Sequence, residues 1–214
     1  MSQILLEHEE LVFNVIEEYL NENRTFDLEK IFSFLNSRFS KSLININNEG
    51  IWKILISLME KKLVIDGTKL TKKELLDYPR RKKICDYINN NSGKVLNKIA
   101  KALGMSSGVV YWHIKLLLKF QLIKKVSIDN HIVYFPSNIE LRDAEKLYLI
   151  SKDKSKKIIN YLKINNFGIS KTQLSTDLKI HHKTINKYLK SLEGHNIITK
   201  EKRSNKTLYF LKDF

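Results

Sequence analysis

Residues 106–120 read SSGVVYWHIKLLLKF, and this stretch carries the pattern that decides the fold. Its first apolar positions follow the 3.6-residue period of an amphipathic helix, and two more come after a longer step. The steps are four, three, five and one residues, at Val110, Ile114, Leu117, Leu122 and Ile123. The predicted outer face of this helix is unusual, because Trp112 lies there beside Lys115 and Lys119.

The same steps occur twice more, which makes this stretch part of a repeat. Towards the C-terminus they fall on Ile185, Leu189, Leu192, Ile197 and Ile198. Towards the N-terminus they fall on Ile51, Leu55, Leu58, Leu63 and Val64. Any amphipathic helix gives a four-and-three match, but three matches that share the five-residue step indicate three related modules.

Each module has the same predicted order: helix, helix, turn, helix and hairpin. Two amphipathic segments precede each third helix, at 11–23 and 26–39, at 80–91 and 95–104, and at 155–166 and 171–179. Two short strands follow it in the middle and last modules, and Asp129-Asn130 suits the tight turn of the middle hairpin. The first module has room only for a stub around Asp66-Gly67. This order is that of a winged helix-turn-helix.

The sequence therefore predicts a mainly α protein with short β-hairpins, an α+β fold of three consecutive winged helix-turn-helix domains. We expect the domains at 1–78, 79–136 and 152–214, with a connector at 137–151 that is part helix and part packed chain. Because only 7 Gly and 2 Pro occur, long coil linkers are not expected.

The turns before the third helices differ in their chemistry. In the middle module Ala100 lets two helices approach closely, and Gly104 permits a left-handed backbone. Either Ser106 or Ser107 is expected to cap the third helix. In the last module Lys179 stands where the glycine would be, which predicts mild backbone strain.

Charge is divided unevenly along the 214 residues, whose formal net charge is +15. Residues 1–78 contain 10 basic and 13 acidic side chains, whereas residues 79–214 contain 28 and 10 and carry a net charge of +18. The basic part predicts a polyanionic partner, either nucleic acid or an anionic membrane surface. A single Cys85, an acidic start and the lack of a long apolar run predict a soluble, cytoplasmic protein.

The residues opposite each apolar stripe distinguish the modules, because a helix turns by about 100° per residue. In the first module they are Glu49, Lys53, Ile56 and Glu60, a face that phosphates would repel. In the middle module they are Gly108, Trp112, Lys115 and Lys119, with Tyr111 beside them. In the last module they are Lys183, Lys187, Lys190 and Gly194, with Asn186 beside them. Two of the three faces therefore suit a polyanion.

Third helices of this motif enter the major groove of DNA with their N-terminal half forward. We therefore expect DNA contacts from Ser106, Ser107, Gly108, Tyr111, Trp112, Lys115 and Lys119 in the middle module. In the last module we expect them from His182, Lys183, Thr184, Asn186, Lys187 and Lys190, and from Lys202, Arg203 and Lys206 of the wing.

Three of these interpretations have alternatives. Trp112 is either a groove-edge or backbone contact, or an anchor that packs against a neighbouring domain. The lysine-rich wing is either a phosphate contact or a solvated edge hairpin. The run Arg80–Lys83 opposes the dipole at a helix start, and so indicates either a phosphate contact or a solvated charge run.

Motifs for other chemistry are missing from the sequence. His181, His182 and His195 have no Cys, Asp or Glu set at ligand spacing, so we expect no metal site, and we assign His181 to a turn. His113 borders the stripe and is expected to be packed. We find neither a phosphate-cradling glycine loop nor a nucleophile–base pair, and we predict no cofactor, no catalytic site and no enzymatic activity.

The stretch from Arg80 to Ile123, with the trailing YFP at 134–136, resembles archaeal transcriptional regulators with tandem winged helix-turn-helix domains. It is also similar, more loosely, to ArsR/MarR-type DNA-binding domains. The match depends on Gly93, on IAKALGMS at 99–106 and on WHI at 112–114. It covers residues 79–214 well and residues 1–78 weakly. Metal sensing through clustered thiols, which ArsR members often use, is not carried over, because the chain has one Cys.

The residues and the resemblance together predict a transcription regulator that binds double-stranded DNA in a sequence-specific way, with no membrane partner. The domains at 79–136 and 152–214 would bind DNA, and the acidic domain at 1–78 would dock another protein or pair with its own copy. The rival interpretation is a winged-helix scaffold that docks proteins, as in ESCRT-II or RNA polymerase accessory subunits.

Overall fold

The computed structural model describes residues 7–23, 25–41, 46–203 and 205–212. The chain divides into two compact units, one of Met1–Tyr87 and Met105–Ile123, the other of Ile88–Gly104 and Lys124–Phe214. The division passes through the middle repeat, so the domain boundaries expected from the sequence stay predictions. The order of elements in each repeat nevertheless follows the winged helix-turn-helix order.

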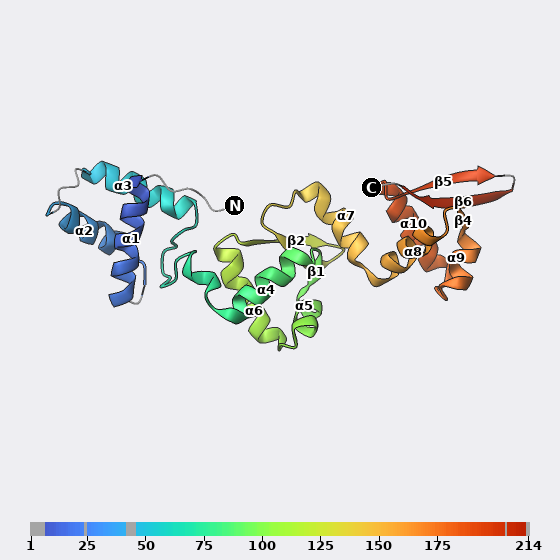
Figure 1. Ribbon diagram of the computed structural model, residues 1–214, viewed down its shortest axis with the longest axis horizontal. Helices are drawn as coiled ribbons and strands as arrows, with labels where there is room; N and C mark the ends of the chain where they lie inside the picture. The colour runs from blue at the N-terminus through green and yellow to red at the C-terminus, as the bar shows by residue number, and fades with distance from the viewer. Residues whose placement is uncertain (1–6, 24, 42–45, 204, 213–214) are drawn as a thin grey trace. The chain divides into compact units, whose positions relative to one another are not determined.

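Three helices make up the first repeat, drawn in blue to cyan in Figure 1. They are α1 (Glu7–Glu22), α2 (Leu28–Phe39) and α3 (Asn48–Glu60), and the short 3-10 helix η1 (Glu74–Leu76) follows them. Ile16, Leu35 and Leu55 lie fully buried in their common core. Asp27 and Asn47 begin α2 and α3, and each side chain accepts a hydrogen bond from a backbone N–H three residues on.

The predicted stub of the first repeat is a minimal wing. Past α3 the chain folds back so that the Lys72 N–H donates to the Leu63 carbonyl at 2.8 Å. Phe26, directly before α2, donates to the carbonyl of Thr68 and accepts from the N–H of Gly67, each at 2.8 Å. The corresponding residues of the other repeats form the short strands β1 and β4. The first repeat therefore keeps the backbone pairing of a wing without a strand in its described residues.

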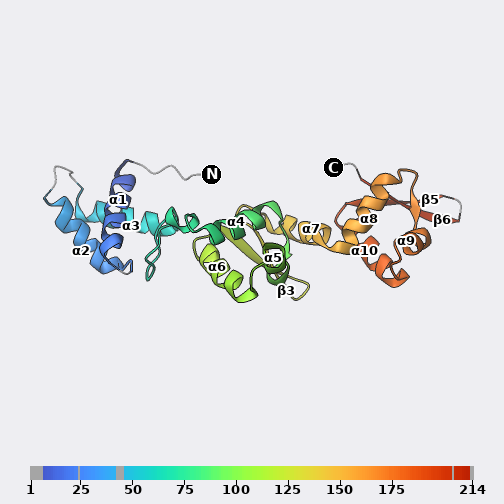
Figure 2. The ribbon, with the colours of Figure 1, turned by 60° about the horizontal axis from the view of Figure 1, so that its bottom comes forward.

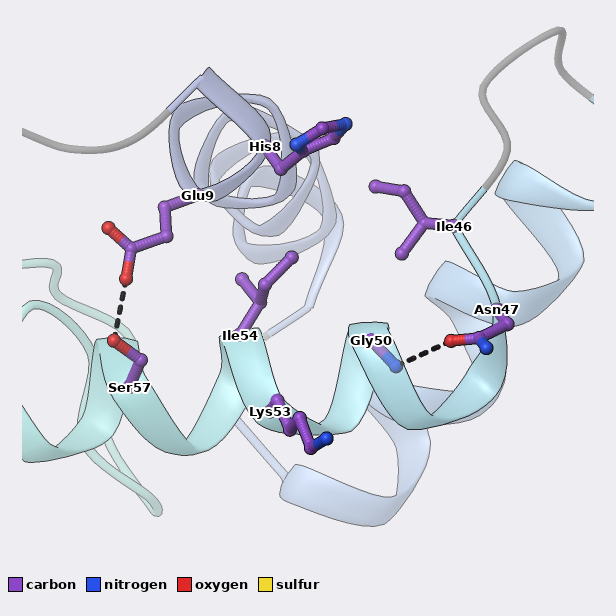
Figure 3. A pocket seen from close by; sticks show the side chains of 8 residues that line it. All are labelled: His8, Glu9, Ile46, Asn47, Gly50, Lys53, Ile54 and Ser57. Carbon is purple, nitrogen blue, oxygen red and sulfur yellow. Dashed lines mark hydrogen bonds between the residues drawn. The ribbon is translucent and has the colours of Figure 1, made fainter.

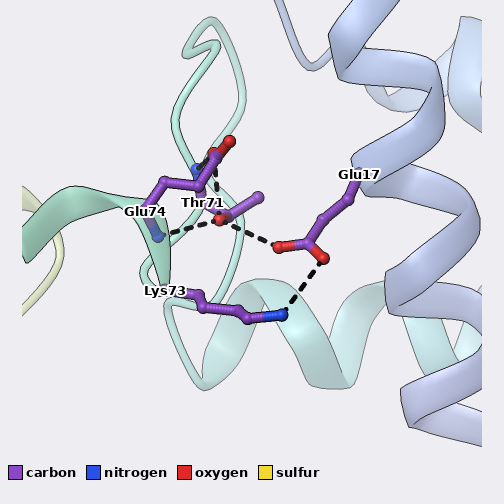
Figure 4. A network of polar contacts seen from close by, with 4 residues as sticks. All are labelled: Glu17, Thr71, Lys73 and Glu74. Atoms are coloured by element: carbon purple, nitrogen blue, oxygen red, sulfur yellow. Dashed lines mark hydrogen bonds and ion pairs between the residues drawn. The ribbon is translucent and has the colours of Figure 1, made fainter. Parts of the chain in front are cut away.

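A polar network ties this minimal wing to α1 (Figure 4). Glu17 of α1 accepts a hydrogen bond from the Thr71 hydroxyl at 3.4 Å and forms an ion pair with Lys73 at 3.6 Å. Glu74 accepts from the backbone N–H of Thr71 at 3.0 Å. These contacts fix the start of η1 on the first repeat.

The middle repeat has the chain order α4, β1, α5, α6, β2, β3. These are α4 (Pro79–Asn90), β1 (Lys94–Val95), α5 (Leu96–Leu103), α6 (Ser107–Lys119), β2 (Ile123–Ile128) and β3 (His131–Pro136). The strands form an antiparallel sheet in the order β1-β3-β2. Asp129 and Asn130 have φ values of 51° and 61°, so the predicted tight hairpin turn is confirmed.

The connector is mostly the helix α7 (Leu141–Ser151), which agrees with the predicted mixture of helix and packed chain. Ala144 and Tyr148 are buried against β3, and Leu149 enters the core of the last repeat. The Ser151 hydroxyl donates to the Gly93 carbonyl at 2.8 Å. Leu141, an apolar residue in the first turn of this helix, is 71% exposed.

In the last repeat α8 and α10 pack against a long hairpin (Figures 1 and 2). Its elements are α8 (Asp153–Ile164), β4 (Ile169–Ser170), α9 (Lys171–Asp177), α10 (His182–Gly194), β5 (Ile198–Arg203) and β6 (Lys206–Leu211). The sheet order β4-β6-β5 repeats the order of the middle sheet. The predicted mainly α fold with three winged-helix units is thereby confirmed.

The shared five-residue step has one structural cause in all three repeats. Lys62, Gln121 and Asn196, which follow the third helices, have left-handed φ values of 54° to 56°. The next residue donates back five positions at 2.9 Å, from Leu63 to Leu58, from Leu122 to Leu117 and from Ile197 to Leu192. This pattern is a Schellman motif, which brings the two apolar residues together where the helix ends.

The turns before α6 and α10 are as the sequence predicts. Gly104 and Lys179 have φ values of 64° and 52°, so lysine adopts the left-handed conformation that glycine supplies in the middle repeat. Ala100 is buried, and the Ser175 hydroxyl donates to the Ile180 carbonyl at 2.7 Å. Ser106, not Ser107, is the cap residue of α6.

Candidate nucleic-acid interface

The third helix of the last repeat, α10, presents its lysines to solvent. Lys183, Lys187 and Lys190 are exposed, as are His182 and Gly194, while Thr184 and Asn186 are half-buried. Within the part of the chain that the structure describes, Lys183 and Lys190 make no ion pair. His181 begins the helix, and its Nδ1 accepts from the Lys183 N–H at 3.2 Å, so the predicted turn role is confirmed. The helix therefore carries exposed cations of which two lack counter-ions.

Lys187 has a neighbour that the sequence did not predict. The turn of the middle hairpin, the C-terminal end of α7 and the side of α10 line a crevice of about 300 Å³ that includes Asp129, Lys152 and Lys187. Asp129 pairs with Lys152 at 2.7 Å. Its carboxyl pKa is lowered, chiefly by the hydrogen bond and charge of Lys152 and more weakly by the charge of Lys187. One of the three lysines thus already interacts with a carboxylate.

The wing of the last repeat is less cationic than its sequence indicates. Lys200 pairs with Glu193 of α10 at 2.9 Å, and this contact raises the pKa of the lysine. Arg203 pairs with Glu201 on the same strand at 2.9 Å. Among the described residues, Lys202 and Lys206 are exposed and make no ion pair. Of the three wing cations expected to contact DNA, Arg203 is therefore partly neutralised, and so is the neighbouring Lys200.

The third helix of the middle repeat, α6, has an aromatic outer face. Tyr111 is 50% exposed and Trp112 is 56% exposed. Lys115 and Lys119 are exposed, and the ammonium of Lys115 lies 5.5 Å from the centre of the Tyr111 ring. Gly108 is exposed too, and a Cβ there would meet nothing within 4 Å, so the protein itself does not require glycine at this position.

The residue that caps the start of this helix already has a hydrogen-bond partner within the protein. The Ser106 hydroxyl accepts from the Val109 N–H at 3.4 Å, which occupies it as a cap. Ser107 is exposed and forms the first residue of the helix. The assignment of all these residues, Ser106 included, to a DNA contact stays a prediction.

Trp112 is held by residues from the start of α4. The Arg81 guanidinium lies 5.9 Å from the Trp112 ring and 5.4 Å from the Tyr78 ring. His113 packs between them, 4.9 Å from Trp112 and 5.3 Å from Tyr78. His113 is only 3% exposed, so its predicted packed position is confirmed. Burial, and then the charges of Arg81 and Arg80, lower its pKa.

Arg81 fits neither interpretation of the run Arg80–Lys83, whereas Arg80, Lys82 and Lys83 are exposed and leave both open. The side chain of Arg81 is 4% exposed and donates to the Leu75 carbonyl at 2.7 Å, so it is neither a phosphate contact nor part of a solvated charge run. The sequence carried a signal for this, because Arg81 lies three, four and seven residues before the buried Ile84, Cys85 and Ile88. That spacing places Arg81 on the core side of α4.

The first repeat offers no comparable face. Lys53 of α3 pairs with Glu49 at 2.6 Å, and Glu60 is exposed. Trp52 is exposed but packs edge-to-face on Phe32, with ring centres 5.4 Å apart. The helix that corresponds to α6 and α10 therefore carries a neutralised lysine and an open carboxylate.

A cavity of about 640 Å³ lies between α1 and α3 of the first repeat (Figure 3). Most of its polar side chains already make contacts within the fold. Glu9 accepts from the Ser57 hydroxyl and from Lys61, each at 2.6 Å, and Asn47 caps α3. We therefore assign the cavity no ligand.

Two features of the described residues bear on other functions. No group of three or more His, Cys, Asp or Glu side chains is placed to hold a metal ion there. No helix in that part of the chain is both long and apolar enough to cross a bilayer.

Winged helices whose exposed third helix is basic are typical of helix-turn-helix proteins that bind nucleic acid. The sequence matches no protein-family profile. Over 144 residues it is 28% identical to a protein of Methanocaldococcus jannaschii named as an uncharacterized HTH-type transcriptional regulator. The match covers 67% of this chain and 36% of that protein, so the chain spans about a third of the length of the curated relative.

A solved structure was also found, the mRNA-binding domain of elongation factor SelB from E. coli in complex with SECIS RNA. It is 12% identical, and the match covers 64% of this chain and 99% of that one. Its TM-score of 0.24 carries no argument about fold or function.

Proposed function

We propose that the protein is a transcription regulator that binds double-stranded DNA in a sequence-specific way through the winged helices of its middle and last repeats. The observation that carries this proposal is the outer face of α10, where Lys183 and Lys190 are exposed without an ion pair among the described residues. Duplex DNA carries about one negative charge per ~1.7 Å of its axis and is surrounded by condensed cations. An exposed row of lysines that contacts its phosphates releases these cations, which favours binding.

The roles of the repeats follow from their charges. The faces of α6 and α10 would lie along the duplex, with the lysines on phosphates and the N-terminal residues of each helix near base edges. The first repeat, with a net charge of −3 over residues 1–78, would dock a protein or a second copy of the chain. The relative named as an HTH-type transcriptional regulator supports a regulatory role of this kind.

The test is a binding titration with a mixed-sequence duplex of about 30 base pairs, roughly three helical turns, at several salt concentrations. We expect the triple variant Lys183→Ala, Lys187→Ala, Lys190→Ala to bind at least ~10-fold more weakly at low salt. The slope of log affinity against log salt should fall by about two to three units, because each lost phosphate contact removes about 0.9.

The matched control is Lys154→Ala, Lys157→Ala, Lys163→Ala on α8 of the same repeat. These lysines are also exposed, and the control removes the same net charge. It should leave most of the affinity and of the salt slope intact. Equal losses for the two triple variants would show a diffuse charge effect and contradict a DNA-binding role for α10.

The rival role, a scaffold that docks proteins, is favoured by one observation, the exposure of Trp112 and Tyr111. A scaffold would bind the duplex only weakly and would lose that binding at moderate salt in both triple variants alike. The titration described above therefore separates the two functions.

A further inference from the structure

Three exposed aromatic rings around α6 have no part in a purely electrostatic contact. Tyr78 is 46% exposed, and Tyr111 and Trp112 are exposed by half or more. Tyr78 and Trp112 flank the buried His113, and Arg81 lies within 6 Å of both rings. We call Tyr78, Tyr111 and Trp112 the aromatic face.

The aromatic face lies over a positive charge that the fold does not neutralise. Arg81 is buried, and no carboxylate among the described residues pairs with it. Its Nε and the Nδ1 of His113 have no hydrogen-bond partner in the structure. A buried charge without a counter-ion destabilises a protein, so this arrangement favours a partner that brings negative charge close by.

The surroundings have the same sign. The sequence of α6 contains no Asp or Glu, its Lys115 lies over the Tyr111 ring, and Arg80 precedes Arg81. An apolar protein side chain packed on Trp112 would remove more water from the Arg81 charge and would supply no negative charge to compensate for it. A partner that is flat, aromatic and negatively charged fits both features, and a nucleotide has all three properties.

We infer that the aromatic face of α6 binds an unstacked nucleobase, which stacks on Trp112 while its phosphate lies near Lys115 and Arg81. This inference rests on the proposed nucleic-acid partner and makes it more specific. A fully paired duplex presents base edges in its grooves and keeps base faces stacked, so the ligand is a base in a single strand or one displaced from a duplex. Stacking on an aromatic side chain tolerates any base, because each base has a π-face.

The two tryptophans make the contact directly observable. In the variant Trp52→Phe the fluorescence comes from Trp112 alone, and Phe at position 52 keeps an aromatic ring beside Phe32. We expect an oligothymidine single strand of about 10 nucleotides to quench this fluorescence; this length lies within the ~4–16 nucleotides that OB-fold domains cover on single strands. An abasic strand of equal length carries the phosphates without the bases and should not quench it.

Affinity gives a second readout. Trp112→Leu should weaken binding of the single strand by about tenfold, the usual contribution of one stacked base, whereas Trp112→Phe should retain most of it. The matched control is Phe167→Leu, which removes an exposed ring from a loop of the last repeat. Because Trp112 is more than half exposed, its replacement should leave the far-ultraviolet circular dichroism spectrum unchanged, and this is checked alongside.

The source of the base is settled by two more ligands. If the protein binds bases displaced from a duplex, a duplex with one unpaired, bulged base should quench Trp112 fluorescence. If it binds open strands, a single strand should quench it. Either result supports the inference. It is overturned if neither ligand quenches, if the abasic strand binds equally well, or if a fully paired duplex quenches as strongly as the single strand.

The outcome is separate from that of the proposed duplex contact. The triple Lys→Ala variant of α10 should lose duplex affinity while its Trp112 remains sensitive to the single strand. Loss of duplex binding without any quenching would leave the proposed function standing and remove only this inference. Quenching of Trp112 without a specific loss of duplex affinity in the α10 variant would support this inference and contradict the proposed role of α10.

Discussion

The third helices of the first and last repeats, α3 and α10, share a scaffold and differ in what they present to solvent. Leu58 and Leu192 occupy the same position in the two helices, both are fully buried, and both accept the i−5 hydrogen bond that ends the helix. On the outer face, however, α3 pairs its lysine with Glu49, whereas α10 exposes three lysines. The apolar stripe fixes the fold and leaves the opposite face open to specialisation.

Because the scaffold is shared, a cavity at the same core position should affect both repeats alike. We expect Leu58→Ala and Leu192→Ala each to lower the free energy of unfolding of its own repeat by about 2–5 kcal/mol. Hydrogen exchange followed by mass spectrometry reports the repeats separately. A loss well below 1 kcal/mol in one repeat would show that its core can collapse and that the two scaffolds are not equivalent.

The position three residues after the first stripe residue sharpens the comparison, because it holds His113 in α6, Ile54 in α3 and Tyr188 in α10. Burial, and then the positive Arg81 and Arg80, lower the pKa of His113, so the folded protein favours the neutral ring. Stability from this group is present above the ordinary pKa of about 6.5 and is lost as the pH falls below it.

We therefore expect thermal unfolding of the unit that contains α6 to shift to lower temperature between about pH 7 and pH 5. His113→Phe, which keeps a ring and removes the titrating group, should flatten this dependence. The control is His195→Asn, outside that unit, where the pH profile should stay as in the unaltered protein. An unchanged profile in His113→Phe would mean that other groups cause the loss.

The sequence predicted the shared scaffold because its causes are local. The four-and-three steps describe a helix stripe, and the five-residue step is the geometry of a Schellman ending, so both follow from neighbours along the chain. Gly104 and Asp129-Asn130 predicted turns for the same reason. The outer faces could be predicted too, since a residue opposite a buried stripe must face outward.

The contacts around those faces could not be predicted, since they depend on residues far apart in sequence. Asp129 and Lys187 come from different repeats, and no local spacing relates them. Arg81 is intermediate: its spacing to Ile84 and Ile88 indicated a buried side, but its charge favoured an exposed interpretation. An arginine can be buried where aromatic rings pack against its guanidinium and a carbonyl accepts its hydrogen bond. Only the fold shows that Tyr78 and Trp112 supply the rings and Leu75 the carbonyl.

The turns before the third helices offer a smaller test, between the middle and last repeats. Gly104 and Lys179 share a left-handed backbone, which costs an ordinary residue about 1 kcal/mol. We expect Lys179→Gly to raise the stability of the last repeat by up to about 1 kcal/mol and Gly104→Ala to lower that of the middle repeat by about 1 kcal/mol. Urea denaturation of each variant measures both, and changes of equal sign would contradict a shared turn geometry.

The smallest expected effect concerns Asp129, a carboxylate on which the charge of Lys187 of α10 acts. In α3 Glu49 neutralises Lys53 directly, whereas in α10 Asp129 acts on Lys187 only at longer range and pairs mainly with Lys152. If this weak opposition reduces the attraction of α10 for phosphates, Asp129→Asn should tighten duplex binding by about threefold, the scale of one exposed charge pair. Asparagine also accepts the left-handed turn conformation, so the hairpin is retained.

The matched control is Asp143→Asn, which removes an exposed carboxylate from the first turn of α7 and changes the net charge equally. Equal gains in the two variants would mean that only total charge matters. A gain confined to Asp129→Asn, abolished when Lys187→Ala is added, would show that the middle hairpin tunes the charge of the last third helix. In that case the difference between α3 and α10 is one of degree, since each helix has a carboxylate set against its lysine and only the distance between the charges differs.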